Sequence, residues 1–320
     1  MSNAPGSAAD ADRRSTYAQA RQDILHKLQR SQLGRVSLGL ALSALSAGLL
    51  VLAFPPFNLW FLVWISFVPF LLAQHRIMPS KLSALAAAAF NGLWLWGYLG
   101  PVFGGSGNFM AYLPLFVAAL SLLTEGSARR FHARTGYRYF MLQGMAAWVG
   151  SEMVRIFIPI AGTWGFVAYT LHSQPWLIQP ASIFGIFGVS ALIILINFAL
   201  GLGALRLLDH QGWDVEPYGV NGDAADADAA DADAADVGAA APAAAQVRRW
   251  LAIAGGTLAG WVALSLLLFA APADPGSTTA RVAAIQPAAS PILSAFTDRD
   301  ELVAELQARM VAQTREAAAQ

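Results

Sequence analysis

An acidic and a basic residue stand three positions apart in the apolar stretch SEMVRIF. On a helix this spacing puts Glu152 and Arg155 on one face. Charge inside a bilayer is costly, so such residues are paired or face protein or water. Two interpretations follow. Either the two side chains form an internal ion pair that fixes helix packing, or Arg155 binds a lipid phosphate near the outer end of the helix while Glu152 orients it.

Residue types for other chemistry are scarce. The sequence contains no cysteine, which excludes disulfides, thiolate metal sites and a cysteine nucleophile from these residues. His172, in the uncharged aromatic loop AGTWGFVAYTLHSQPW, is the residue type of a catalytic base. No serine or aspartate arrangement accompanies it, so interfacial hydrogen bonding is the favoured interpretation. We expect no cofactor and no metal.

The repeat GDAADADAADADAADVGAAAPAAA, at 222–245, could suggest calcium through its aspartates. A calcium loop needs a glycine at its bend and a bidentate glutamate at its end, and both are missing. Alanine and aspartate without large apolar residues cannot build a core. The repeat therefore predicts a disordered linker, within 209–248.

Composition sets the frame in which these residues act. Of the 320 residues 56% are hydrophobic and 12% are charged, whereas soluble chains carry about a quarter charged residues. Zero net charge gives no basic footprint for nucleic acid. Apolar stretches long enough to cross a bilayer predict an α-helical domain of seven transmembrane helices, at 36–54, 58–74, 80–100, 109–124, 138–160, 181–205 and 249–271. Asn91 and Asn197, inside two of them, are expected to form hydrogen bonds between helices.

Arginine and lysine occupy alternate loops. The tail 1–35 is basic, either as a partly ordered tail or with a surface helix at 17–30, whereas 101–108 and 161–180 contain neither residue type. Positive loops stay in the cytoplasm. The tail 1–35 is therefore expected to be cytoplasmic, and everything after Ala271 extracytoplasmic. The remaining basic residues of the cytoplasmic set are Arg76, Lys81, Arg129, Arg130, Arg134, Arg138, Arg206, Arg248 and Arg249.

A soluble α/β pattern follows the last span. RVAAIQP predicts a strand over 281–286, and Leu302, Leu306 and Met310 form one apolar stripe of a helix over about 298–319. One strand and one helix cannot bury that stripe or pair both strand edges. We therefore expect 280–320 to begin an extracytoplasmic domain of a longer chain, truncated here.

Four stretches, in their order, resemble the apolipoprotein N-acyltransferases: LAFPPFNLWFLVWISFVPFLLA, SEMVRIF, SQPWLIQPASIFGIFGVSALIILINFAL and ARVAAIQP. The resemblance covers 36–208 and 249–320. It implies a multi-pass protein of the bacterial inner membrane, whose spans precede a nitrilase-like αββα sandwich. It also implies a phospholipid donor, a lipoprotein acceptor, and transfer of a fatty acyl group to an N-terminal diacylglyceryl-cysteine through a cysteine thioester.

The resemblance also implies a Glu/Lys/Cys catalytic triad, which we expect beyond Gln320, so 1–320 alone should be inactive. Departures leave alternatives open. The family's Phe-Pro-Trp reads Gly162-Thr163-Trp164 here, which puts Trp164 with Arg155 and Glu152 near the expected lipid entry. The family's Gln-Gly-Asn after the first strand is also changed. A related membrane-bound carbon-nitrogen hydrolase or amidase, a transporter and a non-enzymatic membrane anchor are the alternatives.

Overall fold

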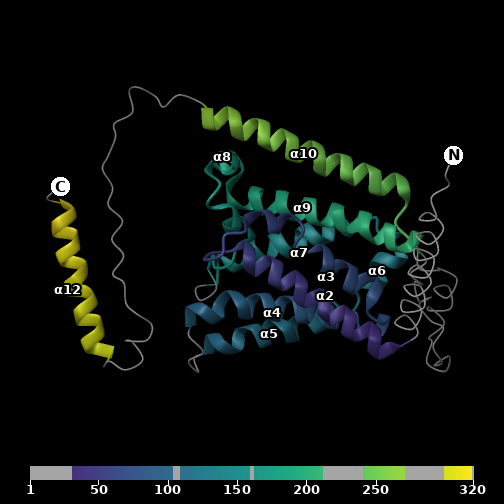
Figure 1. Cartoon of the computed structure of the whole chain (residues 1–320), viewed down its shortest axis with the longest axis horizontal. Helices are drawn as coiled ribbons and strands as arrows, with labels where there is room; N and C mark the ends of the chain where they lie inside the picture. Colours follow the sequence, from purple (N-terminus) through teal and green to yellow (C-terminus); the bar gives the residue numbers. More distant parts are fainter. Residues whose placement is uncertain (1–30, 104–108, 159–161, 212–240, 271–298, 319–320) are drawn as a thin grey trace, which may run out of the picture. The chain divides into compact units, whose positions relative to one another are not determined.

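The computed structural model describes residues 31–103, 109–158, 162–211, 241–270 and 299–318. The chain divides into two compact units, Met1–Ala270 and Ala271–Gln320. Within the described ranges every regular element is a helix (Figure 1). The strand expected at 281–286 and residues 222–240 of the repeat at 222–245 lie outside the described residues, so the nitrilase-like domain and the disordered linker stay predictions.

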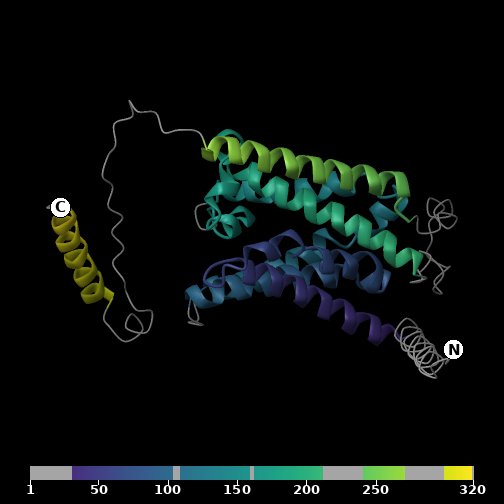
Figure 2. The ribbon, with the colours of Figure 1, turned by 45° about the horizontal axis from the view of Figure 1, so that its top comes forward.

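The first unit is a helical bundle. Helix α4 packs against α5 and α2, whereas α9 packs against α10 and α7, and the short α3 touches both α2 and α9. Figure 2 shows α9 and α10 side by side on one face of this bundle. The helices are α2 Gln32–Ala53, α3 Val68–Leu72, α4 Ala84–Phe103, α5 Phe109–Thr124, α6 Ala128–Arg134, α7 Phe140–Arg155, α8 Pro175–Ile178, α9 Ala181–His210 and α10 Ala244–Ala270.

Five segments of the described chain are long and apolar enough to cross a membrane. They are Gln32–Ala53, Trp60–Ile77, Ser80–Gly100, Ala181–His210 and Ala244–Ala270. The two other expected spans, 109–124 and 138–160, correspond to α5 and α7, which have 16 residues each. The helical membrane architecture is confirmed, whereas the count of seven spans stays a prediction. Many large apolar side chains point outward, such as Leu123 and Phe157, as expected for helices that face lipid.

The second span is not one continuous α-helix. A 3₁₀ turn at Trp60–Trp64 is followed by α3 and then by a π-helical turn at Ala73–Ile77. Such a break strands backbone groups that water cannot reach inside a membrane. Asn197 of α9 accepts a hydrogen bond from the Phe67 amide at 3.0 Å, and Ser46 of α2 accepts one from the Phe70 amide at 2.8 Å. Side chains of two neighbouring helices therefore accept hydrogen bonds from the backbone amides that the break leaves unpaired.

Both asparagines bond between helices as the sequence predicts. Asn197 bridges α9 to the second span, and Asn91 of α4 donates to the Ser121 hydroxyl of α5 at 3.0 Å. Their side chains replace the hydrogen bonds that lipid cannot offer.

Arg76 departs from the expectation of a charge in a cytoplasmic loop. Its side chain is 2% exposed and pairs with Asp209 of α9, with 2.6 Å between Nε and Oδ1. A buried charge at the end of a span is tolerated there because an opposite charge neutralises it.

Helices also occupy both edges of the predicted linker 209–248, since α9 runs to His210 and α10 begins at Ala244.

The second unit contains helix α12, Arg299–Ala318, close to the expected helix over 298–319. Met310 is half exposed, and so is its neighbour Val311. The side chains of Leu302 and Leu306 lie outside the described residues.

Candidate functional site

Glu152 lies in the last turn of α7 and is completely buried. Its Oε1 accepts hydrogen bonds from Trp148 Nε1 at 3.1 Å and from the backbone amide of Val167 at 2.8 Å. Val167 begins the 3₁₀ turn Val167–Leu171. The carboxylate therefore attaches the segment after α7 to the helix itself.

Arg155 is half buried one turn further along α7 and has its own partners. Its Nη1 donates to the backbone carbonyl of Trp164 at 2.9 Å, and its guanidinium carbon lies 5.2 Å from the centre of the Phe166 ring. Within the described ranges, no ion pair joins Arg155 to Glu152, and Arg155 Nε has no hydrogen-bond acceptor. The guanidinium is therefore held by a carbonyl and an aromatic face rather than by a carboxylate.

The residues after Trp164 connect this arginine to helix α4. Trp164 is 45% exposed, and the next residue, Gly165, donates its amide to the Tyr98 hydroxyl at 3.2 Å. Gly165 has a φ of +66°, and a Cβ there would come within 2.9 Å of the Trp94 ring. Only glycine fits both the left-handed backbone and the close approach. The glycine that follows Trp164 is thus required by the close packing of this segment on Trp94 and Tyr98.

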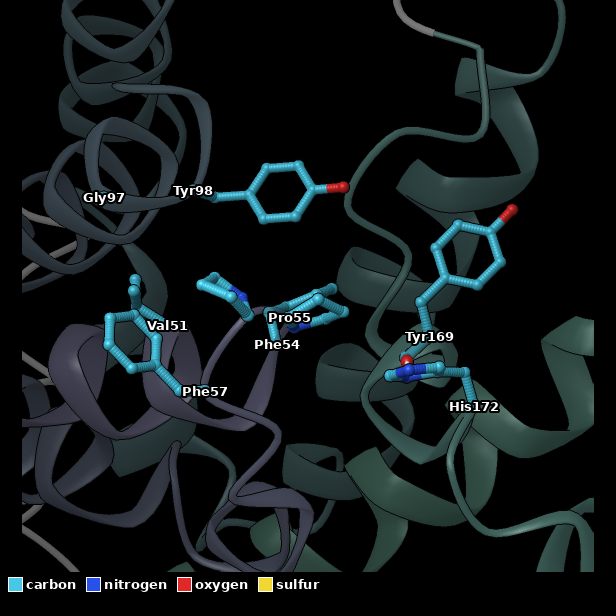
Figure 3. A pocket seen from close by; sticks show the side chains of 9 residues that line it. Val51, Phe54, Pro55, Phe57, Gly97, Tyr98, Tyr169 and His172 are labelled. Atoms are coloured by element: carbon cyan, nitrogen blue, oxygen red, sulfur yellow. Dashed lines mark hydrogen bonds between the residues drawn. The ribbon is translucent and has the colours of Figure 1, made fainter. Parts of the chain in front are cut away.

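A pocket of about 460 Å³ opens beside Tyr98 (Figure 3). Its size falls within the range of small-molecule sites. Most of the wall is apolar, and the hydroxyl of Tyr98 and the imidazole of His172 supply polar groups. The lining residues are Val51, Phe54, Pro55, Pro56, Phe57, Gly97, Tyr98, Tyr169 and His172.

Three parts of the chain meet at this pocket. The FPPF turn follows α2, Tyr98 belongs to α4, and Tyr169 and His172 follow α7. Sequence reasoning used the prolines only as a helix break and missed Tyr98 and Tyr169. Neither tyrosine belongs to a motif, so no local signal could have brought them together.

His172 contacts the backbone carbonyl of Tyr169 through Nδ1 at 3.0 Å. This backbone contact agrees with the hydrogen-bonding interpretation. Tyr169 and His172 stand together on one side of the pocket in Figure 3.

The three sequence-predicted site residues thus fall in one region with the pocket. Glu152 holds the segment that carries Val167, Arg155 contacts Trp164, and Gly165 next to it contacts Tyr98 of the pocket wall. A cation beside an apolar pocket with a polar side suits an amphiphile with an anionic head and a hydrocarbon chain.

Known proteins provide an independent comparison. The profile of the apolipoprotein N-acyltransferase N-terminal domain matches residues 46–199, which include Glu152, Arg155 and the whole pocket lining. The chain is 31% identical over 173 residues to the apolipoprotein N-acyltransferase of Geobacter metallireducens. That match covers 50% of this chain and 32% of the relative, so the chain spans about a third of the relative's length. No solved structure matches the chain. Residues 46–199 are therefore similar to the N-terminal domain of the apolipoprotein N-acyltransferase family.

Proposed function

We propose that the protein transfers a fatty acyl group from a phospholipid to the N-terminal diacylglyceryl-cysteine of apolipoproteins. The similarity of residues 46–199 to that family supports acyl transfer in lipoprotein maturation, and the apolar helices support a multi-pass bacterial membrane protein. We place it in the inner membrane, with the amino terminus in the cytoplasm.

The observation that carries this proposal is the connection of Arg155 to the pocket wall, through the Trp164 carbonyl and the hydrogen bond of the next residue, Gly165, to Tyr98. The guanidinium binds the phosphate of the donor phospholipid, because its planar fork matches phosphate oxygens in a bidentate geometry. The apolar wall that includes Phe54 and Phe57 takes an acyl chain of the same lipid. Trp164, exposed beside Arg155, packs at the interface between the head group and the chain.

The covalent steps need a thiolate. The thiolate attacks the ester carbonyl of the phospholipid, forms a thioester and releases a lysophospholipid, whose alkoxide takes a proton. The acceptor's α-amine then attacks the thioester, loses a proton, forms the amide and releases the thiolate, and this proton balances the one that the alkoxide took. The 320 residues contain no cysteine, so the part proposed for them is the donor site, and the proposed thiolate is not one of their side chains.

Substitution of Arg155 tests this role in the intact protein. Arg155→Lys keeps the charge without the fork and should be partly active, whereas Arg155→Ala should lose about tenfold to a hundredfold of thioester formation. Attack by the amine on a preformed thioester should be unchanged. The measurement is acyl-enzyme accumulation per folded molecule in vesicles.

Arg206→Ala is the matched control, because Arg206 also donates to a backbone carbonyl, that of Pro242, at 2.8 Å. Its acylation rate should equal that of the wild type. If Arg155→Ala lowers only the protein level, and the remaining folded enzyme forms the thioester at the wild-type rate, Arg155 is scaffold and the phosphate role is wrong.

A further inference from the structure

We propose that the contact between Val51 and Gly97 is the end wall of the acyl-chain site and sets the chain length that the pocket accepts. This inference rests on the proposed function, because it takes the bound chain to be that of a phospholipid. It assigns specificity to two residues that carry no chemistry of their own.

The wall is formed where helices α2 and α4 come together. A Cβ on Gly97 would lie 2.8 Å from Cγ2 of Val51, well inside van der Waals contact. Glycine at this position therefore lets α4 approach the side chain of α2. The β-branched Val51 has one strongly preferred rotamer in a helix, so it cannot easily turn away. The two residues form a rigid surface, and both line the pocket.

The polar groups of the pocket stand on another side. Figure 3 places Val51 and Gly97 on one side and Tyr169 and His172 on the opposite side, with Phe54 and Pro55 between them. Tyr98 connects through Gly165 to the segment that contacts Arg155.

This arrangement gives a bound lipid one favourable direction. Its ester and phosphate lie toward Tyr98, His172 and Arg155, because polar groups buried without partners are costly. Its hydrocarbon end then lies against Val51 and Gly97. A chain that is too long meets the rigid wall, and a chain that is too short leaves a gap. Each methylene that fits contributes roughly fourfold to binding, from its transfer free energy.

The test uses the purified chain in vesicles and a phospholipid with a photoreactive group at the end of one acyl chain. Mass spectrometry of the cross-linked peptides should place the chain end near Val51 or Gly97. Competition by phospholipids that share one head group but differ in acyl length then gives the preferred length.

Val51→Ala moves the wall back and should shift the preferred length upward by about one or two methylenes, with a change of roughly fourfold or more in relative competition. Val51→Ile should shift it downward. Gly97→Ala in the Val51→Ala background refills the space and should return the preference toward the wild type. Val262→Ala on α10 is the control, since Val262 is also partly buried against the core but does not line the pocket.

An unchanged preference in a folded Val51→Ala variant would overturn the inference, as would cross-links confined to other helices. Failure of the proposed function gives a different result. A length shift without acyl transfer in the intact protein would leave a lipid site in a protein of another activity. If acyl transfer depends on Arg155 and the preferred chain length does not change in Val51→Ala, the proposed function stands and the role of Val51 and Gly97 in chain length is wrong.

Discussion

Asn197 and Phe67, far apart in the sequence, share a hydrogen bond at the break in the second span. The asparagine Oδ1 accepts from the Phe67 amide at 3.0 Å, while its Nδ2 donates to the Val63 carbonyl at 2.7 Å. One side chain of α9 therefore satisfies backbone groups on both sides of the break.

Replacing Asn197 by leucine should destabilise the bundle. The substitution leaves a buried amide and a buried carbonyl without partners, at a cost of about 1–3 kcal/mol for each group. Asn91→Leu is the comparison, because Asn91 bonds to a hydroxyl, which also donates to the Val117 carbonyl, and no backbone group is stranded. Thermal unfolding in detergent should show the larger loss for Asn197→Leu, and equal losses would contradict this interpretation.

Two glycines of α7 should respond in opposite ways to alanine. A Cβ on Gly144 would overlap the Phe198 ring of α9, whereas a Cβ on Gly150 would meet nothing within 4 Å. Gly144→Ala should therefore cost about 1–3 kcal/mol by overpacking. Gly150→Ala should be neutral or stabilise by up to about 1 kcal/mol, because alanine loses less backbone entropy in a helix. Similar unfolding temperatures for the two variants would show that α7 and α9 are not in this contact.

The buried pair of Arg76 and Asp209 should be sensitive to loss of one partner. Asp209→Asn leaves the guanidinium of Arg76, 2% exposed, without its counter-charge and should cost about 3–5 kcal/mol. Arg76→Met combined with Asp209→Leu removes both charges and should recover most of that loss. Unfolding curves of the two variants test this, and Glu125→Gln, which alters a part-buried contact with Gln74, should change little. A double variant no more stable than Asp209→Asn would argue against a charge effect.

His132 predicts a loss of stability in acid. Burial lowers the pKa of His132 in α6 from 6.5 to about 4. The unfolded chain then binds a proton below about pH 6.5 that the folded chain does not bind until about pH 4. The contribution is fully present above pH 6.5 and falls through this window, by about 3 kcal/mol at most.

The measurement is the unfolding temperature between neutral and mildly acidic pH. His132→Gln should show a smaller fall than the wild type, because the glutamine does not titrate. Tyr137 and His75 pack against this imidazole and remain in the variant. An unaltered fall in His132→Gln would assign the acid sensitivity to another group.

Reporter fusions test the predicted orientation. The arginine-rich loops predict that 222–245 lies in the cytoplasm and that the residues after Pro287 lie outside it. A reporter active only in the cytoplasm should work in the first position and fail in the second. Exchanged reporter activities would overturn the predicted topology.

Deletion of 222–245 should leave membrane insertion and activity of the intact protein almost unchanged.

Local patterns in the sequence were enough for the class of protein and for most helix positions. The hydropathy of consecutive residues is enough to predict a membrane span. The period of a helix is enough to predict that Glu152 and Arg155 lie on one face. The order of four stretches was enough to indicate the family, which the matching profile confirms. The broken second span was only partly visible. Pro55 and Pro56 were used to predict the turn before it, whereas Pro69, which stands in the first turn of α3 just after Phe67, was not used as a sign of the break.

Tertiary structure alone decided which groups meet. The spacing in the sequence allowed an ion pair between Glu152 and Arg155. In the structure Glu152 instead bonds to Val167 and Arg155 to Trp164, because the segment after α7 folds back over that helix. The wall of Val51 and Gly97 depends on how closely two helices approach, which neither residue type specifies. Periodicity tells which face of a helix is apolar, whereas the partner of a buried polar or tightly packed atom depends on contacts between distant parts of the chain.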